Sequence, residues 1–194
     1  MRIVVGMSGS SASVYGIRLL EALHELPDVE TELVMSPSAA LNIREETAWD
    51  PEDVKKLATR VHDHKDIGAT ISSGSYKTDG MVVAPCSINT LSGIAYSMNA
   101  NLLVRAADVT LKERRRLVLI VRETPLHRGH LRNMLEVTEN GGVIMPPVPS
   151  FYHHPKSIDE IINHTVARVL DLMGVEHNLS RRWAGLQSML EGAK

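Results

Sequence analysis

The residues Gly9, Ser10 and Ser11 stand shortly after an apolar, β-branched segment at positions 3–5. Backbone amides and hydroxyls at a junction between a strand and a helix meet the positive end of the helix dipole, which is an anion or nucleotide site in outline. The spacing matches neither G-x-G-x-x-G nor a P-loop, and no lysine follows, which speaks against NAD and ATP. An ordinary strand-to-helix turn explains the same pattern.

A second cluster of this kind follows the apolar segment at 81–84. Ser87, Ile88, Asn89 and Thr90 again put hydroxyl and amide groups at the start of an expected helix. The carboxyl ends of parallel strands meet at one edge of a sheet, where open α/β folds bind ligands. Two such turns favour a nucleotide-sized ligand, although Ser87 is equally explained as a helix N-cap.

Charged residues follow the next apolar segment, 117–121. Arg122 suits a phosphate, and Glu123 suits proton transfer if it is partly desolvated. An ion pair between these two neighbours is the alternative.

Arg168 falls on or beside the apolar stripe of the last expected helix. A buried guanidinium needs a partner, which can be an anionic ligand or a structural carboxylate, unless the side chain reaches solvent. Tyr152 ends a proline-rich segment, 146–152, that leads to this helix. Its hydroxyl either joins Arg168 in holding a phosphate or caps the core.

The paired histidines and the single cysteine predict no metal site. His62 and His64 are two apart and His153 and His154 are adjacent, so neither pair shares a helix face. Cys86 ends an apolar strand, where buried filler is its expected role.

Apolar runs alternate with segments of helical periodicity, which predicts an α/β, Rossmann-like fold with a parallel sheet and helices on both faces. The expected strands are 2–7, 29–36, 80–86, 117–121 and 143–147, and the expected helices are 12–26, 38–46, 51–61, 87–98, 102–115, 127–140 and 157–174. Asp50 is expected to cap the third helix, and Ser157 and Glu160 to form a capping box that opens the last one, which Gly174 ends.

Length and composition limit the function. The chain has 194 residues, 43% of them hydrophobic, which fits one main domain at 1–174 and a tail at 175–194. A net charge of −2 gives no electrostatic footprint for nucleic acid. Its apolar runs are too short to cross a membrane, and the first residues do not resemble a signal peptide, so a cytoplasmic location is expected.

Several motifs together resemble one family. They are Gly-Ser-Ser-Ala-Ser-Val-Tyr-Gly at 9–16, Ser-Ser-Gly-Ser at 72–75, Ala-Pro-Cys-Ser at 84–87, Arg-Ala-Ala-Asp-Val at 105–109, Leu-Lys-Glu-Arg at 111–114, Val-Arg-Glu-Thr-Pro-Leu at 121–126 and Pro-Pro-Val-Pro-Ser-Phe-Tyr-His at 146–153. In this order the chain resembles the UbiX-like flavin prenyltransferases, and more narrowly the accessory proteins encoded with hydroxyaryl-acid decarboxylases.

The resemblance implies an activity and its site. Such an enzyme joins the dimethylallyl group of dimethylallyl monophosphate to N5 and C6 of reduced FMN, for use by a UbiD-like decarboxylase, and it forms a metal-independent homododecamer. The residues implied to bind FMN are Gly9, Ser10, Ser11, Ser36, Ser87, Ile88, Asn89, Thr90 and Arg122. Those implied to hold the donor are Arg105, Lys112, Tyr152, Arg168 and Trp183, with Arg105 and Lys112 coming from the same chain or from across a subunit boundary. Ser11, Glu46 and Glu123 match residues near the reacting centre.

One position departs from the pattern, and two other functions stay open. Ile67 stands where some family members have a tryptophan ahead of the Ser-Gly-Ser loop, which leaves the preferred prenyl donor open. The alternatives are a flavin-dependent cysteine decarboxylase of the same fold and a protein that only carries FMN. The first is disfavoured because no Pro-x-Met-Asn-x-x-Met-Trp string occurs, and the second because basic residues are spaced for a second phosphate.

Overall fold

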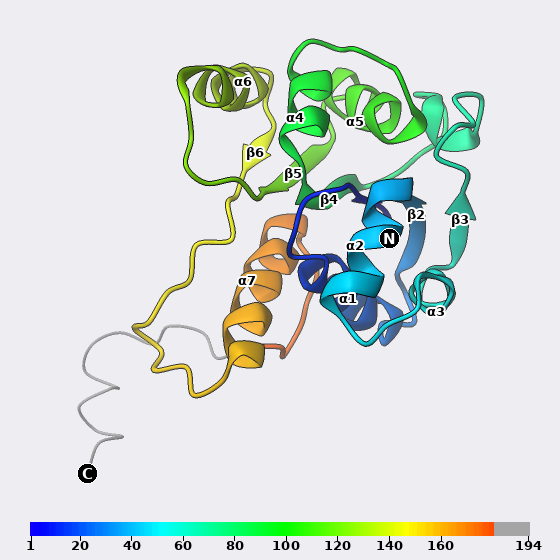
Figure 1. Cartoon of the computed structure of the whole chain (residues 1–194). Helices are drawn as coiled ribbons and strands as arrows, with labels where there is room; N and C mark the ends of the chain where they lie inside the picture. The colour runs from blue at the N-terminus through cyan, green and yellow to red at the C-terminus, as the bar shows by residue number, and fades with distance from the viewer. Residues whose placement is uncertain (181–194) are drawn as a thin grey trace. The chain divides into compact units, whose positions relative to one another are not determined.

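The computed structural model describes residues 1–180 of the chain. It divides into two compact units, residues 1–147 and the residues from 148 on, and each is described by itself. The first unit is built on a six-stranded sheet with the strand order β3-β2-β1-β4-β5-β6, in which every neighbouring pair is parallel (Figure 1). This confirms the predicted α/β class with a parallel sheet. The predicted boundary at residue 174 stays a prediction.

The elements follow one another in an alternating order. The strands are β1 (Arg2–Met7), β2 (Glu30–Met35), β3 (Arg60–His62), β4 (Gly80–Cys86), β5 (Arg116–Val121) and β6 (Val143–Ile144). The helices are α1 (Val14–His24), α2 (Pro37–Glu46), α3 (Pro51–Lys56), the short 3₁₀ helix η1 (Thr70–Ser72), α4 (Ile88–Ala95), α5 (Leu102–Lys112), α6 (Arg128–Glu139) and, in the second unit, α7 (Ile158–Met173).

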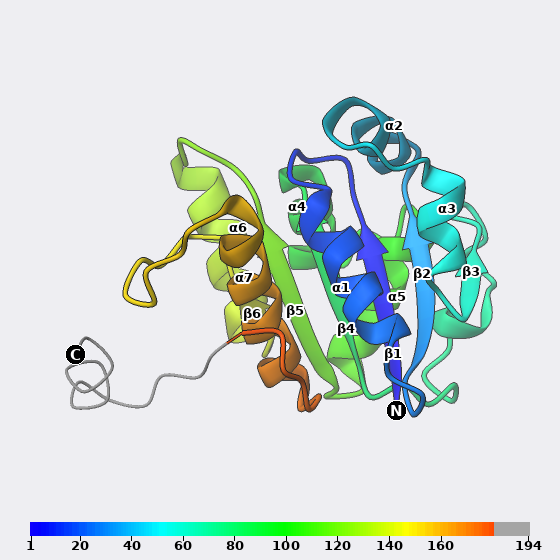
Figure 2. The same ribbon diagram turned by 90° about the horizontal axis from the view of Figure 1, so that it is seen from below.

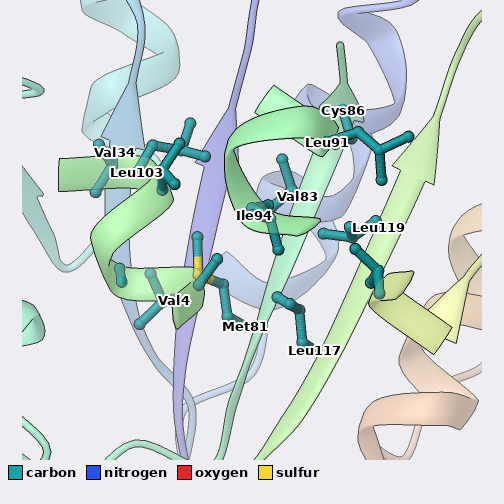
Figure 3. Close-up of a cluster of buried hydrophobic side chains, with 14 of the residues drawn as sticks. Val4, Val34, Met81, Val83, Cys86, Leu91, Ile94, Leu103, Leu117 and Leu119 are labelled. Atoms are coloured by element: carbon teal, nitrogen blue, oxygen red, sulfur yellow. The ribbon is translucent and has the colours of Figure 1, made fainter. Parts of the chain in front are cut away.

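Helices cover both faces of the sheet in the first unit, as predicted. Helix α1 packs on one face, against β1, β2 and β4, and α5 packs on the other, against β2, β4 and β5 (Figure 2). Alternate strand residues supply the two faces because successive side chains of a strand point in opposite directions. The α4 and α5 face is a buried apolar cluster that includes Val4, Met81, Val83, Leu103 and Leu119 (Figure 3).

The predicted helix at 51–61 was wrong in its second half. Helix α3 ends at Lys56, and Arg60–His62 form the edge strand β3 instead, paired with β2 in the register Glu32↔Arg60. The pairing is secured by Glu32, which is 2% exposed and lies 2.5 Å from His62 Nε2. A strand of three residues, made by contacts to a distant segment, leaves no periodic signal in the sequence.

Other predicted boundaries shift for local reasons. Helix α4 ends at Ala95 and α5 at Lys112, because Ser97 (φ 52°) and Arg114 (φ 57°) adopt left-handed backbone conformations. Strand β6 is short and stops before Pro146, since proline has no N–H for a ladder. The cap at Asp50 is confirmed, because its carboxylate accepts from Glu52 N at 2.8 Å.

The second unit contains α7 and the loop before it. Ser157 Oγ accepts from Glu160 N at 3.2 Å, and Gly174 follows the helix at φ 73°, so both predicted ends are confirmed. Val166 and Val169 are buried as expected, whereas Ile158, in the first turn, is 77% exposed and does not belong to the predicted apolar stripe.

Candidate functional site

The loops that follow β1 and β4 are tied together by Ser8. Its hydroxyl donates to Pro85 O at 2.9 Å and accepts from Ser87 N at 2.8 Å, and Ser8 is 2% exposed. Ser8 N also donates to Pro85 O at 3.2 Å. These bonds bring the two predicted anion-binding turns to one edge of the sheet, as their position after parallel strands led us to expect.

The loop after β1 already holds a carboxylate at the start of α1. Glu46 Oε2, from the last residue of α2, accepts from Ala12 N at 2.8 Å and from Ser13 N at 3.1 Å. Ala12 has a left-handed backbone conformation, with φ 81°. A carboxylate on two amides at a helix N-terminus shows that this turn stabilises an anion. The structure therefore brings Glu46 to the predicted site.

Two hydroxyls near this loop lack a partner. The Oγ atoms of Ser10 and Ser13 are buried and form no hydrogen bond within residues 1–180. Buried hydroxyls usually have a partner, so a ligand with polar atoms fits here. Gly9 lies close to α2, since a Cβ on it would stand 2.3 Å from Ser38 Cβ. Ser11 is exposed in the same loop.

Both serines after β2 and β4 are helix N-caps. Ser36 Oγ accepts from Ala39 N at 3.1 Å, and Ser87 Oγ accepts from Thr90 N at 3.3 Å. Ser87 also donates to Thr90 Oγ1 at 3.1 Å. The cap interpretation of Ser87 is thus confirmed. It does not compete with ligand binding, because the first-turn amides of Ile88 and Asn89 belong to the set that has no acceptor inside a helix.

Arg122 and Glu123 lie at the same edge. Arg122 N donates to Cys86 O at 3.2 Å, which places the loop after β5 beside the end of β4. The Glu123 carboxylate accepts from its neighbour Thr124 N at 3.1 Å. No ion pair joins Arg122 to Glu123 within the described part of the chain, so the predicted alternative for this pair is not observed. The exposed guanidinium of Arg122 remains suited to a ligand phosphate.

Arg105 and Lys112 are not brought to this edge. Both are on α5, whose last residue precedes the amino end of β5. Arg105 donates to Ser72 O at 3.3 Å and to Asp108 Oδ2 at 3.0 Å, and Lys112 is paired with Glu113. Within one chain, these cations lie beside the 72–75 loop and do not complete the site with Ser87.

The second unit contains Tyr152 and Arg168. The Tyr152 hydroxyl lies 2.9 Å from His164 Nε2, and Arg168 donates to Asp171 Oδ2 at 2.6 Å. The Arg168 side chain is 54% exposed, so Arg168 lies beside the buried stripe and not on it. Its partner in this structure is a carboxylate of the same helix, three residues on, and not a group buried in the core. Trp183 lies outside the described residues.

Comparison with known proteins assigns the chain to a family. The family model described as Flavoprotein matches residues 1–170. The flavin prenyltransferase UbiX of Thauera aromatica is 60% identical over 185 residues, which are 95% of this chain and 95% of that protein. The chain belongs to the UbiX family of flavoproteins.

Solved UbiX structures share its fold closely. A dodecameric FMN-dependent UbiX-like decarboxylase from Escherichia coli O157:H7 is 51% identical with a TM-score of 0.93, over 95% of this chain and all of that one. AnUbiX, in complex with FMN and dimethylallyl pyrophosphate, is 50% identical with a TM-score of 0.93, over 95% of this chain and 97% of that one. The peptidyl-cysteine decarboxylase EpiD, at 18% identity and a TM-score of 0.62, shares the fold alone.

Sequence reasoning missed two residues of this UbiX site. Ser8 and Ser13 flank the predicted serines, and both are buried hydroxyls. Both stood in the serine-rich segment after the first apolar run, but neither was given a role, because the sequence does not distinguish a buried hydroxyl from an exposed one. The described residues contain no group of three or more His, Cys, Asp or Glu that could hold a metal ion.

Proposed function

We propose that this chain is a flavin prenyltransferase that joins the dimethylallyl group of dimethylallyl monophosphate to N5 and C6 of reduced FMN. The observation that carries the proposal is the 60% identity to a named flavin prenyltransferase over 95% of the chain. The edge of the sheet at the carboxyl ends of β1 and β4, called here the carboxyl edge, supports it, because both predicted turns lie there and the first of them has buried hydroxyls without a partner at Ser10 and Ser13.

FMN is a substrate of this reaction, and the carboxyl edge fits it. The amides of Ile88 and Asn89 and the guanidinium of Arg122 suit the phosphate, since helix N-termini and arginine bind phosphate oxygens. Ser10 offers a buried hydroxyl without a partner to the remaining polar atoms. Ser36 caps the neighbouring helix at the same edge.

The donor phosphate needs several cations around it, and the proposed ones, Arg168, Arg105 and Lys112, do not all belong to the same unit of the chain. Tyr152 and Arg168 are proposed to hold it, and Arg168 must then exchange Asp171 for the phosphate. Arg105 and Lys112 are proposed to come from a neighbouring copy, because in their own chain they face the 72–75 loop. The dodecameric relative supports an assembly in which copies meet.

The chemistry needs no protein nucleophile. Breaking the C1–O bond of the donor leaves an allylic cation and phosphate. N5 bonds to C1 and loses its proton, the remaining double bond is protonated at C2, and C6 then bonds to C3 and loses a proton, so that the flavin gains C5H8 in all. Cations on the leaving phosphate stabilise the charge that develops there. Glu123, or the departing phosphate, takes the C6 proton. Ser11 is proposed to lie beside N5, and Glu46, which holds the start of α1, beside the reacting centre.

The product is proposed to serve a UbiD-like decarboxylase, and the enzyme to act in the cytoplasm as a homododecamer. No helix among the described residues is both long and apolar enough to cross a bilayer. Adding the product to a cofactor-free UbiD-like enzyme and measuring its decarboxylation of aromatic acids tests the partner separately from the transfer itself.

Mass spectrometry tests the transfer. The protein is incubated anaerobically with reduced FMN and either dimethylallyl monophosphate or the diphosphate, and the flavin is extracted. A flavin heavier by one C5H8 unit is expected with the monophosphate. Unmodified FMN with both donors would overturn the proposal and leave an FMN carrier. Carbon dioxide release from a peptidyl cysteine would instead indicate a cysteine decarboxylase.

A further inference from the structure

The ring of His164 is held on three sides in the second unit. Its Nε2 lies 2.9 Å from the Tyr152 hydroxyl, and the two rings meet edge to face at 81°. Its Nδ1 lies 3.3 Å from Ser150 Oγ, which is also 3.4 Å from Nδ1 of His153. The His153 ring stacks on that of His164, with centroids 4.3 Å apart and planes 6° from parallel. This geometry fixes both the position and the plane of the imidazole.

The hydrogen carried by His164 decides where the Tyr152 hydroxyl points. A neutral imidazole has one N–H and one acceptor nitrogen. If the N–H is on Nδ1, Nε2 accepts the phenol hydrogen, and Tyr152 then presents only lone pairs to an anion. If the N–H is on Nε2, it donates to the phenol oxygen, and the phenol hydrogen is directed elsewhere. Only the second arrangement lets Tyr152 donate to a phosphate.

Ser150 makes the second arrangement accessible at no loss of hydrogen bonds. Its hydroxyl can donate to Nδ1 of His164, or donate to His153 and accept from His164, because a hydroxyl rotates to suit either neighbour. The exchange therefore needs only a hydroxyl rotation and a change of imidazole tautomer.

We propose that His164 is a positioning residue for the prenyl donor: its Nε2–H holds the Tyr152 oxygen, so that the phenol hydrogen is directed to the donor phosphate. The inference rests on the proposed function, in which Tyr152 binds that phosphate. His164 acts through Tyr152 and does not touch the reacting atoms.

The charges around His164 fit this role. Within residues 148–180, the titratable or charged groups that face it are Tyr152, His153 and Arg168. Burial, then His153 and Arg168, lower the pKa of His164 below its ordinary 6.5, so the ring is neutral at pH 7. A donor phosphate beside Arg168 offsets the positive charge of that residue. The phosphate also favours the His164 tautomer with its N–H on Nε2, because the Tyr152 hydroxyl can then donate its hydrogen to the phosphate.

The test is donor affinity in FMN-loaded protein, measured by calorimetry with dimethylallyl monophosphate. His164→Leu removes the donor and should weaken the affinity about 10-fold, the equivalent of one hydrogen bond to a charged group. His164→Gln is the matched control, because its amide N–H₂ can donate to the phenol oxygen, and it should stay within about 3-fold of the wild type. FMN affinity should be unchanged in both.

A double-mutant cycle separates positioning from packing. In a Tyr152→Phe background, His164→Leu should have little further effect, because the group it positions is gone. The idea is refuted if His164→Leu and His164→Gln bind the donor equally well, or if the full loss persists without the Tyr152 hydroxyl.

The pH dependence of donor binding gives a further test. Between pH 7.5 and 5.5, the affinity ratio of wild type to His164→Gln should rise as the pH falls, since protonation puts an N–H on Nε2 of the wild type only; a constant ratio counts against the inference. Donor binding without any product would defeat the proposed function and leave this inference testable.

Discussion

Replacing Ser8 by alanine should separate the two turns that form the carboxyl edge. The change removes the acceptor of Ser87 N, at 2.8 Å, and one of two donors to Pro85 O. The other donor to Pro85 O, Ser8 N at 3.2 Å, remains, so the Ser87 N–H is the one group that is left without a partner. A partly buried N–H without an acceptor costs about 2 kcal/mol. The free energy of unfolding should fall by that amount.

The assay is urea unfolding of the FMN-free protein, with all variants at one protein concentration because assembly stabilises the fold. The midpoint should drop while the m-value stays the same. FMN affinity should also weaken, by about 10-fold, if the loosened loops lose one hydrogen bond to the ligand. Ser13→Ala is the control, since its equally buried hydroxyl has no partner and its removal should cost less than about 0.5 kcal/mol. Equal stability of Ser8→Ala and wild type would refute the reasoning.

Three further perturbations have expected outcomes. Asp171→Asn should release Arg168 and lower the donor dissociation constant about 2- to 5-fold, the range of an exposed ion pair; an unchanged or weaker affinity in calorimetry would contradict this. Gly16→Ala should destabilise the fold by about 2–3 kcal/mol in urea unfolding, because its Cβ would lie 2.2 Å from a carbonyl oxygen of β4; wild-type stability would show that α1 shifts freely. Burial lowers the pKa of His64 below 6.5, so its contribution to stability is present above pH 6.5 and lost as the pH falls. Unfolding free energy measured from pH 7.5 to 5 should therefore fall less steeply in His64→Asn, and equal slopes would remove His64 as the cause.

Local patterns predicted the sheet, and tertiary contacts explain what they missed. Five strands carry apolar runs long enough to be recognised, and caps such as Asp50 depend on neighbours in the sequence. Strand β3 depends on Glu32 and His62, which lie 30 residues apart. No periodicity within a segment encodes such a pairing, so the third helix was predicted too long.

In the candidate site too, local sequence predicted some features, whereas others depend on tertiary contacts. Turns after strands indicated where anions could bind, and in one of them the Glu46 carboxylate, from the end of α2, accepts from Ala12 N at the start of α1. The exposure of Arg168 was not predictable from helical spacing, because a long side chain beside an apolar stripe can reach solvent, where this one finds Asp171. Ser8 stood in the turn after the first strand without a predicted role, since its role arises from its hydrogen bonds to a distant loop.

The proposed function requires one site for FMN and one for the donor phosphate, and a crystal structure with both ligands tests these two sites most directly. Oxidised FMN is used so that the donor is not consumed. We predict FMN at the amides of 87–90, and the donor phosphate on Tyr152 and Arg168, with Arg105 and Lys112 reaching it from a neighbouring copy. A single occupied cavity, with Arg168 still paired to Asp171, would contradict the proposal.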